Sequence, residues 1–357
     1  MIVPRGFWYN KPMNLNKFLF WLGLACVIAR PIGAFASPIP GTGTDARYAT
    51  DAYPGFDSED NLVKPSKKTP KFLSFIFGPK KDNPADQLEW SRQCESEGSW
   101  RAARKGYDAL VREWPASPEA VKAQKAYADL LLNHDLDYEA AFNEYRYLID
   151  FYSLECDFGE VVEMMYKVAE LMREEGKTIV FFRFSNTVDV RRAYEAVVLR
   201  APGAAFAPKA MLTIAQLRED EEKYTEAVQV YENLRSLYPG APEAMTALRR
   251  EGAVRMKLLE MHGYNRERVR DSIAFFRKSL RGRLDDEVRE EFEEDLDATV
   301  EMEADEAYKA AKFYDSRTRT RRSAISAYER FLRDYPASSH VEEVRARIES
   351  LKEGSPQ

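Results

Sequence analysis

The sequence predicts an all-α fold made of stacked helical hairpins. One pattern recurs: a small or branched residue, an aromatic four positions later, an apolar residue three further on, then a second aromatic after four more and proline directly behind it. Three copies of this pattern are complete: Ala103, Tyr107, Leu110, Trp114 and Pro115; Ala227, Tyr231, Leu234, Tyr238 and Pro239; Ala324, Tyr328, Phe331, Tyr335 and Pro336. With 12% aromatic and 31% charged residues, the composition is typical of helical repeats, in which aromatic side chains fill the layers between helices.

The spacing of the pattern has a direct physical meaning. Positions i, i+4, i+7 and i+11 lie on one face of an α-helix, and the following proline ends that helix because it lacks an amide donor. Two further copies are imperfect, and equivalent tyrosines lie 38, 49 and 37 residues apart: Tyr107, Tyr145, Tyr194 and Tyr231. Helix pairs of this size are similar to tetratricopeptide repeats. We therefore predict a tetratricopeptide-like solenoid of about five to six helix pairs over residues 84–352, followed by a short tail at 353–357.

Two segments interrupt the rhythm of the repeats. Residues 178–184 are expected to form an inserted loop or a short extended piece. Residues 285–306 carry thirteen acidic residues and one basic residue, yet they keep a four-residue apolar stripe, which predicts one long amphipathic helix with an acidic outer face. The arginines that follow are candidate partner-binding residues, and their pairing with residues 285–306 is an equally weighted alternative: Arg317, Arg319, Arg321 and Arg322.

The first 36 residues are predicted to be a signal peptide. An apolar run of twelve residues, 18–29, follows a basic start and is too short to cross a bilayer, and Ala36 ends a small-x-small cleavage site. Met13 is an alternative start. Cys26 supports a second hypothesis, in which the chain is cut before this cysteine and acylated on it. Both hypotheses predict a mature protein that works outside the cytoplasm.

Residues 37–83 are predicted to be a flexible linker, because they are rich in Gly, Pro, Asp, Ser and Thr and show no sustained periodicity. The short aromatic segment 72–77 interrupts it and is flanked by lysines. This segment is expected either to pack on the first helix pair or to touch an anionic membrane surface.

Nothing in the sequence predicts catalysis, a metal or a cofactor. The net charge of −6 argues against nucleic acid as a partner. Cys94 and Cys156 form no CxxC pair, and the three histidines lie far apart in the sequence: His134, His262 and His340. We therefore expect a non-enzymatic protein with no catalytic, cofactor-binding or metal site.

Part of the sequence resembles a known family. Three stretches near the C-terminus carry the resemblance, 310–317, 324–328 and 332–338, together with Phe181-Phe182, 189–194 and 238–242. They are similar to the BamD-type (YfiO-type) outer-membrane assembly lipoproteins, and the resemblance covers about residues 86–350.

This resemblance implies a scaffold of the outer-membrane β-barrel assembly machinery, on the periplasmic face of the outer membrane. It implies a lipid anchor at Cys26 and C-terminal repeats that hold the barrel-inserting protein, with Arg317 and its neighbours in that interface. Other assembly lipoproteins and unfolded outer-membrane protein segments are further implied partners. The alternative is a soluble periplasmic tetratricopeptide adaptor that coordinates cell-wall synthesis with envelope constriction.

Overall fold

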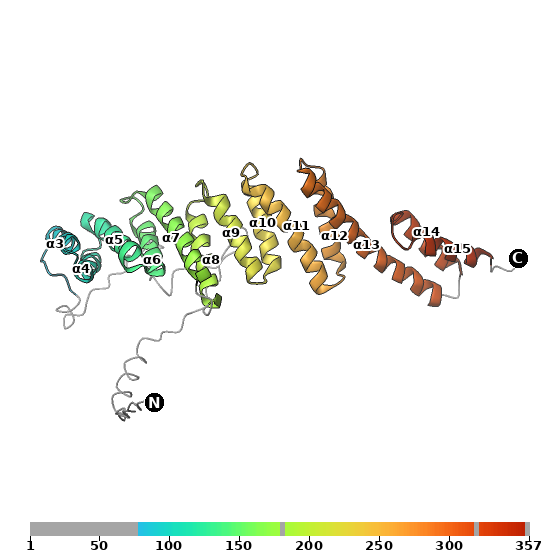
Figure 1. Cartoon of the computed structure of the whole chain (residues 1–357), viewed down its shortest axis with the longest axis horizontal. Coiled ribbons are helices and arrows are strands. Elements are labelled where there is room, and N and C mark those ends of the chain that lie inside the picture. Colours follow the sequence, from blue (N-terminus) through green and yellow to red (C-terminus); the bar gives the residue numbers. More distant parts are fainter. Residues whose placement is uncertain (1–77, 179–182, 318–320, 354–357) are drawn as a thin grey trace, which may run out of the picture. The chain divides into compact units, whose positions relative to one another are not determined.

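The computed structural model describes residues 78–178, 183–317 and 321–353, and these residues form α-helices joined by short turns (Figure 1). The chain divides into two units, Met1–Pro65 and Ser66–Gln357, and every described residue lies in the second. The predicted signal peptide, Cys26, Ala36, Met13 and the aromatic segment 72–77 lie outside the described residues. None of the helices in the described part of the chain is long and apolar enough to cross a membrane.

The described helices follow one another along the chain, and each packs against the next. Their bounds are α3 (Pro84–Ser96), α4 (Trp100–Glu113), α5 (Pro118–Leu130), a π-helical turn η3 (Leu131–Asp135), α6 (Tyr138–Tyr152), α7 (Phe158–Thr178), α8 (Arg183–Arg200), α9 (Ala207–Asp220), α10 (Tyr224–Leu237), α11 (Glu243–His262), α12 (Arg266–Leu280), α13 (Asp286–Arg317), α14 (Arg321–Asp334) and α15 (Val341–Glu353). We call α14 and α15 the C-terminal hairpin.

Local sequence sets several of these helix starts. Asn83 caps α3 by accepting the Asp86 amide at 2.8 Å, and Pro84 follows as the first helical residue. Ser117 and Pro118 repeat this arrangement at α5, where the Ser117 hydroxyl accepts the Ala120 amide at 3.2 Å. The first helix of the repeat region therefore begins at residue 84.

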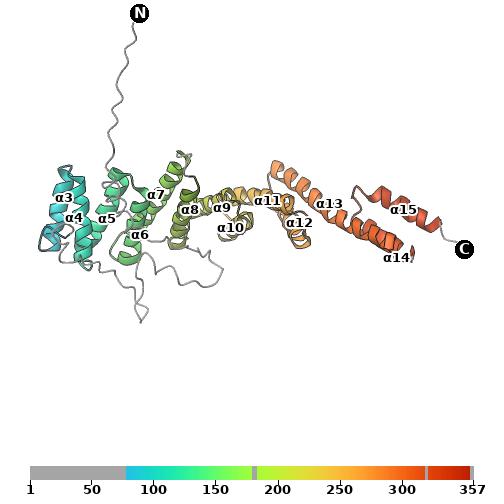
Figure 2. The same ribbon diagram turned by 90° about the horizontal axis from the view of Figure 1, so that it is seen from below.

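Each helix packs mainly against its neighbours along the chain. In addition, α3 contacts α5, α9 contacts α11, and α11 contacts α13. Figure 2 shows the same succession from a second direction, with α13 reaching from α12 to α14. Contacts confined to near neighbours define a repeat solenoid. The all-α, tetratricopeptide-like fold is confirmed.

The recurring tyrosines form the centre of the hairpins, as predicted, but they also make a polar contact that the pattern did not show. Tyr107 and Tyr194 are fully buried, and their hydroxyls donate to Glu95 and Glu170, each at 2.5 Å. The same bond recurs between Tyr145 and Asp129, Tyr231 and Glu219, and Tyr328 and Asp315. Each of these tyrosines therefore joins its own helix to the preceding helix through a buried ring and a carboxylate-bound hydroxyl.

The second aromatic of the pattern connects successive hairpins. The hydroxyl of Tyr152 donates to the carbonyl of Pro115 at 2.7 Å, and that of Tyr238 donates to the carbonyl of Pro202 at 2.6 Å. Because proline ends the preceding repeat, its carbonyl has no helical partner and is free to accept this bond. The terminal aromatic and proline thus act together across two repeats.

All but the first residue of the acidic segment 285–306 lies within α13, a helix of 32 residues that continues to Arg317. Its first half packs Val288 and Phe292 against Phe275 and Phe276 of α12. Its second half belongs to a separate core with the C-terminal hairpin, built from Ala304, Tyr308, Ala311, Tyr328, Phe331, Val344 and Ile348. One helix therefore contributes to more than one hydrophobic core.

Candidate functional site

The predicted partner-binding arginines gather where α13 ends and α14 begins. Arg317 is the last residue of α13, although its side chain is outside the described part of the structure, as is all of Arg319. Arg321 and Arg322 are the first two residues of α14 and are exposed. Within the described ranges, neither Arg321 nor Arg322 makes an ion pair.

The acidic face of α13 pairs with other helices. Arg249 of α11 bonds Glu287 and Glu291, each at 2.8 Å, and Arg270 of α12 bonds Glu303 at 3.1 Å. The last acidic residue of the segment 285–306 precedes Arg317 by eleven residues, which is about 16 Å of helix rise. The structure therefore does not pair Arg321 or Arg322 with the acidic segment, and their guanidinium groups face solvent.

Two exposed aromatic side chains lie on the last turns of α13, immediately before the arginines. Phe313 is 55% exposed and Tyr314 is 49% exposed, and their ring centroids are 6.2 Å apart in an edge-to-face arrangement. We call Phe313, Tyr314, Arg321 and Arg322 the basic-aromatic surface. The sequence analysis did not propose these two aromatics as binding residues. Both lie outside the buried stripe of Ala304, Tyr308 and Ala311, and this position off the buried face was the signal that could have indicated their exposure.

A pocket of about 480 Å³ lies between α13, α14 and α15, next in sequence to these aromatics. Its lining is rich in charged groups and comprises Tyr308, Lys312, Asp315, Tyr328, Glu343, Ala346, Arg347 and Ser350. Arg347 binds Asp315 through two nitrogens, at 2.7 and 3.2 Å. The Arg347 guanidinium accordingly holds the pKa of Asp315 below its usual range.

The other charges of the pocket are also paired. The Lys312 ammonium lies 3.6 Å from Glu343 and 5.0 Å from the centroid of the Tyr308 ring. The Tyr308 hydroxyl donates to Glu343 as well. Two cations balance two carboxylates in this pocket, so its charged groups pair with one another within the chain.

Sequence comparison identifies one of the repeats directly. Residues 209–241 match the tetratricopeptide repeat. The matched segment covers most of α9 and all of α10, a hairpin that carries one of the three complete copies of the pattern. No curated protein matches the chain.

Several solved structures are similar to the chain. A thermophilic TPR protein from Thermus thermophilus is 15% identical, with 60% of this chain and 99% of that chain covered and a TM-score of 0.28. A tetratricopeptide repeat protein from Parabacteroides merdae is 12% identical. That match covers 75% of this chain and 98% of that chain, with a TM-score of 0.29. A putative kinesin light chain with TPR-like repeats from Podospora anserina is 12% identical. That match covers 57% of this chain and 100% of that chain, with a TM-score of 0.27.

The described part of the chain is thus an all-helical solenoid, and residues 209–241 in it match the tetratricopeptide repeat. Tetratricopeptide repeats form scaffolds for protein–protein interaction, and the fold is typically non-catalytic.

Proposed function

We propose that the chain is a non-enzymatic scaffold of the machinery that assembles outer-membrane β-barrel proteins, and that the basic-aromatic surface holds the periplasmic part of the barrel-inserting protein. One observation carries the proposal. The stretch whose sequence resembles the assembly lipoproteins, 310–317, exposes Phe313 and Tyr314 on the last turns of α13, and α14 begins with the exposed Arg321 and Arg322. The proposal includes the periplasmic face of the outer membrane as the location and a lipid anchor at Cys26.

The chemistry of this surface suits a protein partner. Aromatic and arginine side chains are enriched among the residues that dominate binding energy at protein interfaces. Phe313 and Tyr314 offer apolar area that packing within the chain leaves half exposed, while Arg321 and Arg322 offer guanidinium groups with no ion pair among the described residues. The complementary partner surface carries carboxylates around an apolar anchor.

The test is a quantitative pull-down from envelope membranes that measures recovery of the barrel-inserting protein. Two paired variants remove the surface, Phe313→Ala with Tyr314→Ala and Arg321→Glu with Arg322→Glu. Each pair is expected to reduce affinity at least about thirtyfold, which corresponds to the ~2 kcal/mol loss of an interface hot spot. Circular dichroism of each variant should match that of the parent, since these side chains contribute little to the core.

The C-terminal hairpin offers a matched control. Arg333 and Arg345 are also exposed, but each already has an acidic neighbour, Asp334 at 3.6 Å and Glu342 at 2.9 Å. Reversing both charges should leave recovery of the barrel-inserting protein unchanged. Equal loss with the control pair, or recovery of cell-wall synthesis proteins in place of a barrel-inserting protein, would contradict the proposal.

A further inference from the structure

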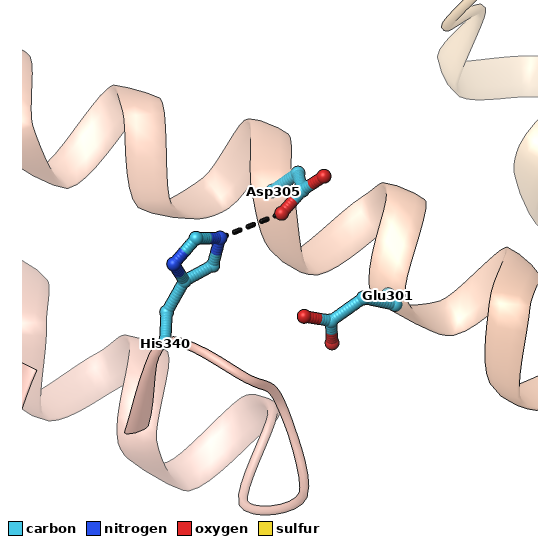
Figure 3. Close-up of side chains that lie close together, drawn as sticks. All are labelled: Glu301, Asp305 and His340. Carbon is cyan, nitrogen blue, oxygen red and sulfur yellow. Dashed lines mark hydrogen bonds and ion pairs between the residues drawn. The ribbon is translucent and has the colours of Figure 1, made fainter. Parts of the chain in front are cut away.

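Two carboxylates of α13 and a histidine at the start of α15 converge on one point, as Figure 3 shows. Glu301 and Asp305 lie four residues apart on α13, so they share one face of that helix. His340 directly precedes α15, where its carbonyl accepts the Val344 amide at 3.0 Å. One potential ligand atom from each of the three side chains lies within 4.8 Å of the other two.

The imidazole is held in a defined position. Its Nε2 atom lies 2.6 Å from an Asp305 carboxylate oxygen, and its ring stacks on Tyr308 with centroids 4.1 Å apart and an interplanar angle of 16°. The side chain of His340 keeps 26% of its surface exposed and that of Asp305 keeps 48%. The ring is therefore fixed, while the point of convergence stays open to solvent and to ions.

Glu301 is held in place by the turn that leads into α15. One of its carboxylate oxygens accepts the Ser338 hydroxyl at 3.1 Å, the Ser339 amide at 3.0 Å and the Ser339 hydroxyl at 2.5 Å. Burial opposes ionisation of Glu301, but these donors outweigh it and keep the pKa of its carboxyl below the usual range. The second oxygen of the same ionised group accepts none of these bonds.

These three groups match the donors that zinc prefers. Zn²⁺ binds imidazole nitrogen and carboxylate oxygen at about 2.0–2.2 Å with tetrahedral geometry, so two ligand atoms on one ion lie roughly 3.4 Å apart. The three ligand atoms lie within 4.8 Å of one another, so the widest separation has to close by up to about 1.4 Å, and the 2.6 Å contact between His340 and Asp305 has to open by less than about 1 Å. The nitrogen donor disfavours Ca²⁺ and Mg²⁺, which take oxygen ligands.

We propose that Glu301, Asp305 and His340 bind Zn²⁺, with water completing the coordination, and that the ion ties α15 to α13. Hydrogen bonds from outside the ligand set typically orient the ligands of metal sites, and the Ser338 and Ser339 donors to Glu301 have this arrangement. The site is independent of the basic-aromatic surface, because none of its three ligands belongs to that surface.

The test is a calorimetric titration of the metal-free full-length chain with Zn²⁺, repeated for two ligand variants. His340→Phe removes the nitrogen but keeps a ring that can stack on Tyr308, and Glu301→Gln keeps the shape of the carboxylate side chain. Each variant should raise the dissociation constant at least about tenfold. Visible absorption of the Co²⁺ form should show the strong bands of a low-coordinate site in the wild type and lose them in the His340→Phe variant.

The chain contains a matched control histidine. His134 lies 3.0 Å from Asp135 and stacks on Trp100 with centroids 4.5 Å apart, but no second carboxylate among the described residues completes a ligand set around it. His134→Phe should leave Zn²⁺ affinity unchanged. A wild-type chain that takes up no Zn²⁺, or a His340→Phe variant that binds it as tightly as the wild type, would overturn the proposed site.

A second measurement tests the tie between the two helices. Zn²⁺ should slow hydrogen exchange of the α15 amides in the wild type and in the His134→Phe variant, and have no effect in the His340→Phe variant. Binding that depends on His340 but leaves the exchange of α15 unchanged would refute the tie.

Discussion

The bond between a repeat tyrosine and a carboxylate of the preceding helix makes a testable contribution to stability, and Tyr107 offers the clearest case. Its side chain is fully buried and its hydroxyl donates to Glu95 at 2.5 Å. Burial, and then the adjacent Glu95 carboxylate, raise the pKa of the Tyr107 phenol well above its usual range. The hydroxyl therefore keeps its proton and remains a donor throughout the pH range in which the chain would be studied.

Tyr107→Phe removes the hydroxyl and keeps the ring, so the substitution opens almost no cavity. Hydrogen bonds to charged acceptors contribute about 1.5–3 kcal/mol, and water can reach the half-buried Glu95, so we expect a loss of about 1.5 kcal/mol. Tyr107→Ala also removes the ring from the core, and its expected loss is about 3–5 kcal/mol. The difference between the two variants separates the polar contribution from the packing contribution.

The assay is urea unfolding followed by circular dichroism, combined with hydrogen exchange of the α3 and α4 amides, because solenoids open locally. A double-mutant cycle with Glu95→Ala should give a coupling energy of about 1 kcal/mol. Tyr264→Phe is the control: Tyr264 is 38% exposed, and its change should stay within about 0.5 kcal/mol. A coupling energy near zero would refute the idea that the carboxylate contact stabilises the hairpin.

Three further substitutions test other parts of the solenoid by urea unfolding. Gly252→Ala would place a methyl group 2.8 Å from the Phe292 ring, so it should destabilise the folded chain by about 1–2 kcal/mol. This loss is expected even though alanine favours helix more than glycine does. An unchanged urea midpoint would contradict the close approach of Gly252 to the ring. Glu251 is fully buried between the side chains of Arg235 and Arg255. Glu251→Ala should lower the free energy of unfolding by about 3–5 kcal/mol, because it leaves the two arginine charges without their partner. A loss under about 1 kcal/mol would contradict this role of Glu251. Burial, and then neighbouring glutamates, raise the pKa of Asp295 to about 6, so its ionisation destabilises the fold as the pH rises from about 4 through 6. Asp295→Asn should therefore stabilise the chain by about 1 kcal/mol at pH 7 and have no effect below about pH 4, and a difference that does not depend on pH would refute the assignment.

The sequence predicted the helices and their succession because the relevant information is local. An apolar stripe at i, i+4, i+7 and i+11 with a terminal proline specifies a helix of one length and one buried face, whatever the rest of the chain does. The long helix over residues 285–306 was found for the same reason, since Val288 and Phe292 keep the stripe among acidic residues. Its continuation to Arg317 was missed because a different core buries its second half.

The acceptors of the repeat tyrosines could not be predicted from spacing. Glu95 precedes Tyr107 by twelve residues, whereas Glu170 precedes Tyr194 by twenty-four, because the lengths of the helices and turns between them differ. The contact is set by how two helices lie side by side, which a one-dimensional pattern does not encode. A carboxylate on the first helix of each pair was the only sequence signal, and acidic residues are common there.

The proposed zinc ligands were missed for a related reason. Glu301 and Asp305 stood among many acidic residues, and His340 follows Asp305 by thirty-five positions. Only the return of the chain through α14 brings the histidine to the face of α13 that carries both carboxylates. Distance along the sequence does not show whether a histidine lies near a carboxylate, because an antiparallel hairpin folds the chain back on itself.

Both proposed sites lie at the last described hairpin, and the physics of a solenoid makes this position responsive to ligands. Inner repeats are stabilised on both sides, whereas a terminal repeat has one interface fewer. The buried stripe of Ala304, Tyr308 and Ala311 on α13 packs against that hairpin, so the hairpin and the second half of the helix depend on each other. A ligand that binds only the folded hairpin stabilises it by mass action, and the gain is largest in relative terms where intrinsic stability is lowest. The effects of the protein partner and of Zn²⁺ should therefore appear first in the exchange of the α14 and α15 amides, and only weakly in the unfolding of α3 to α10.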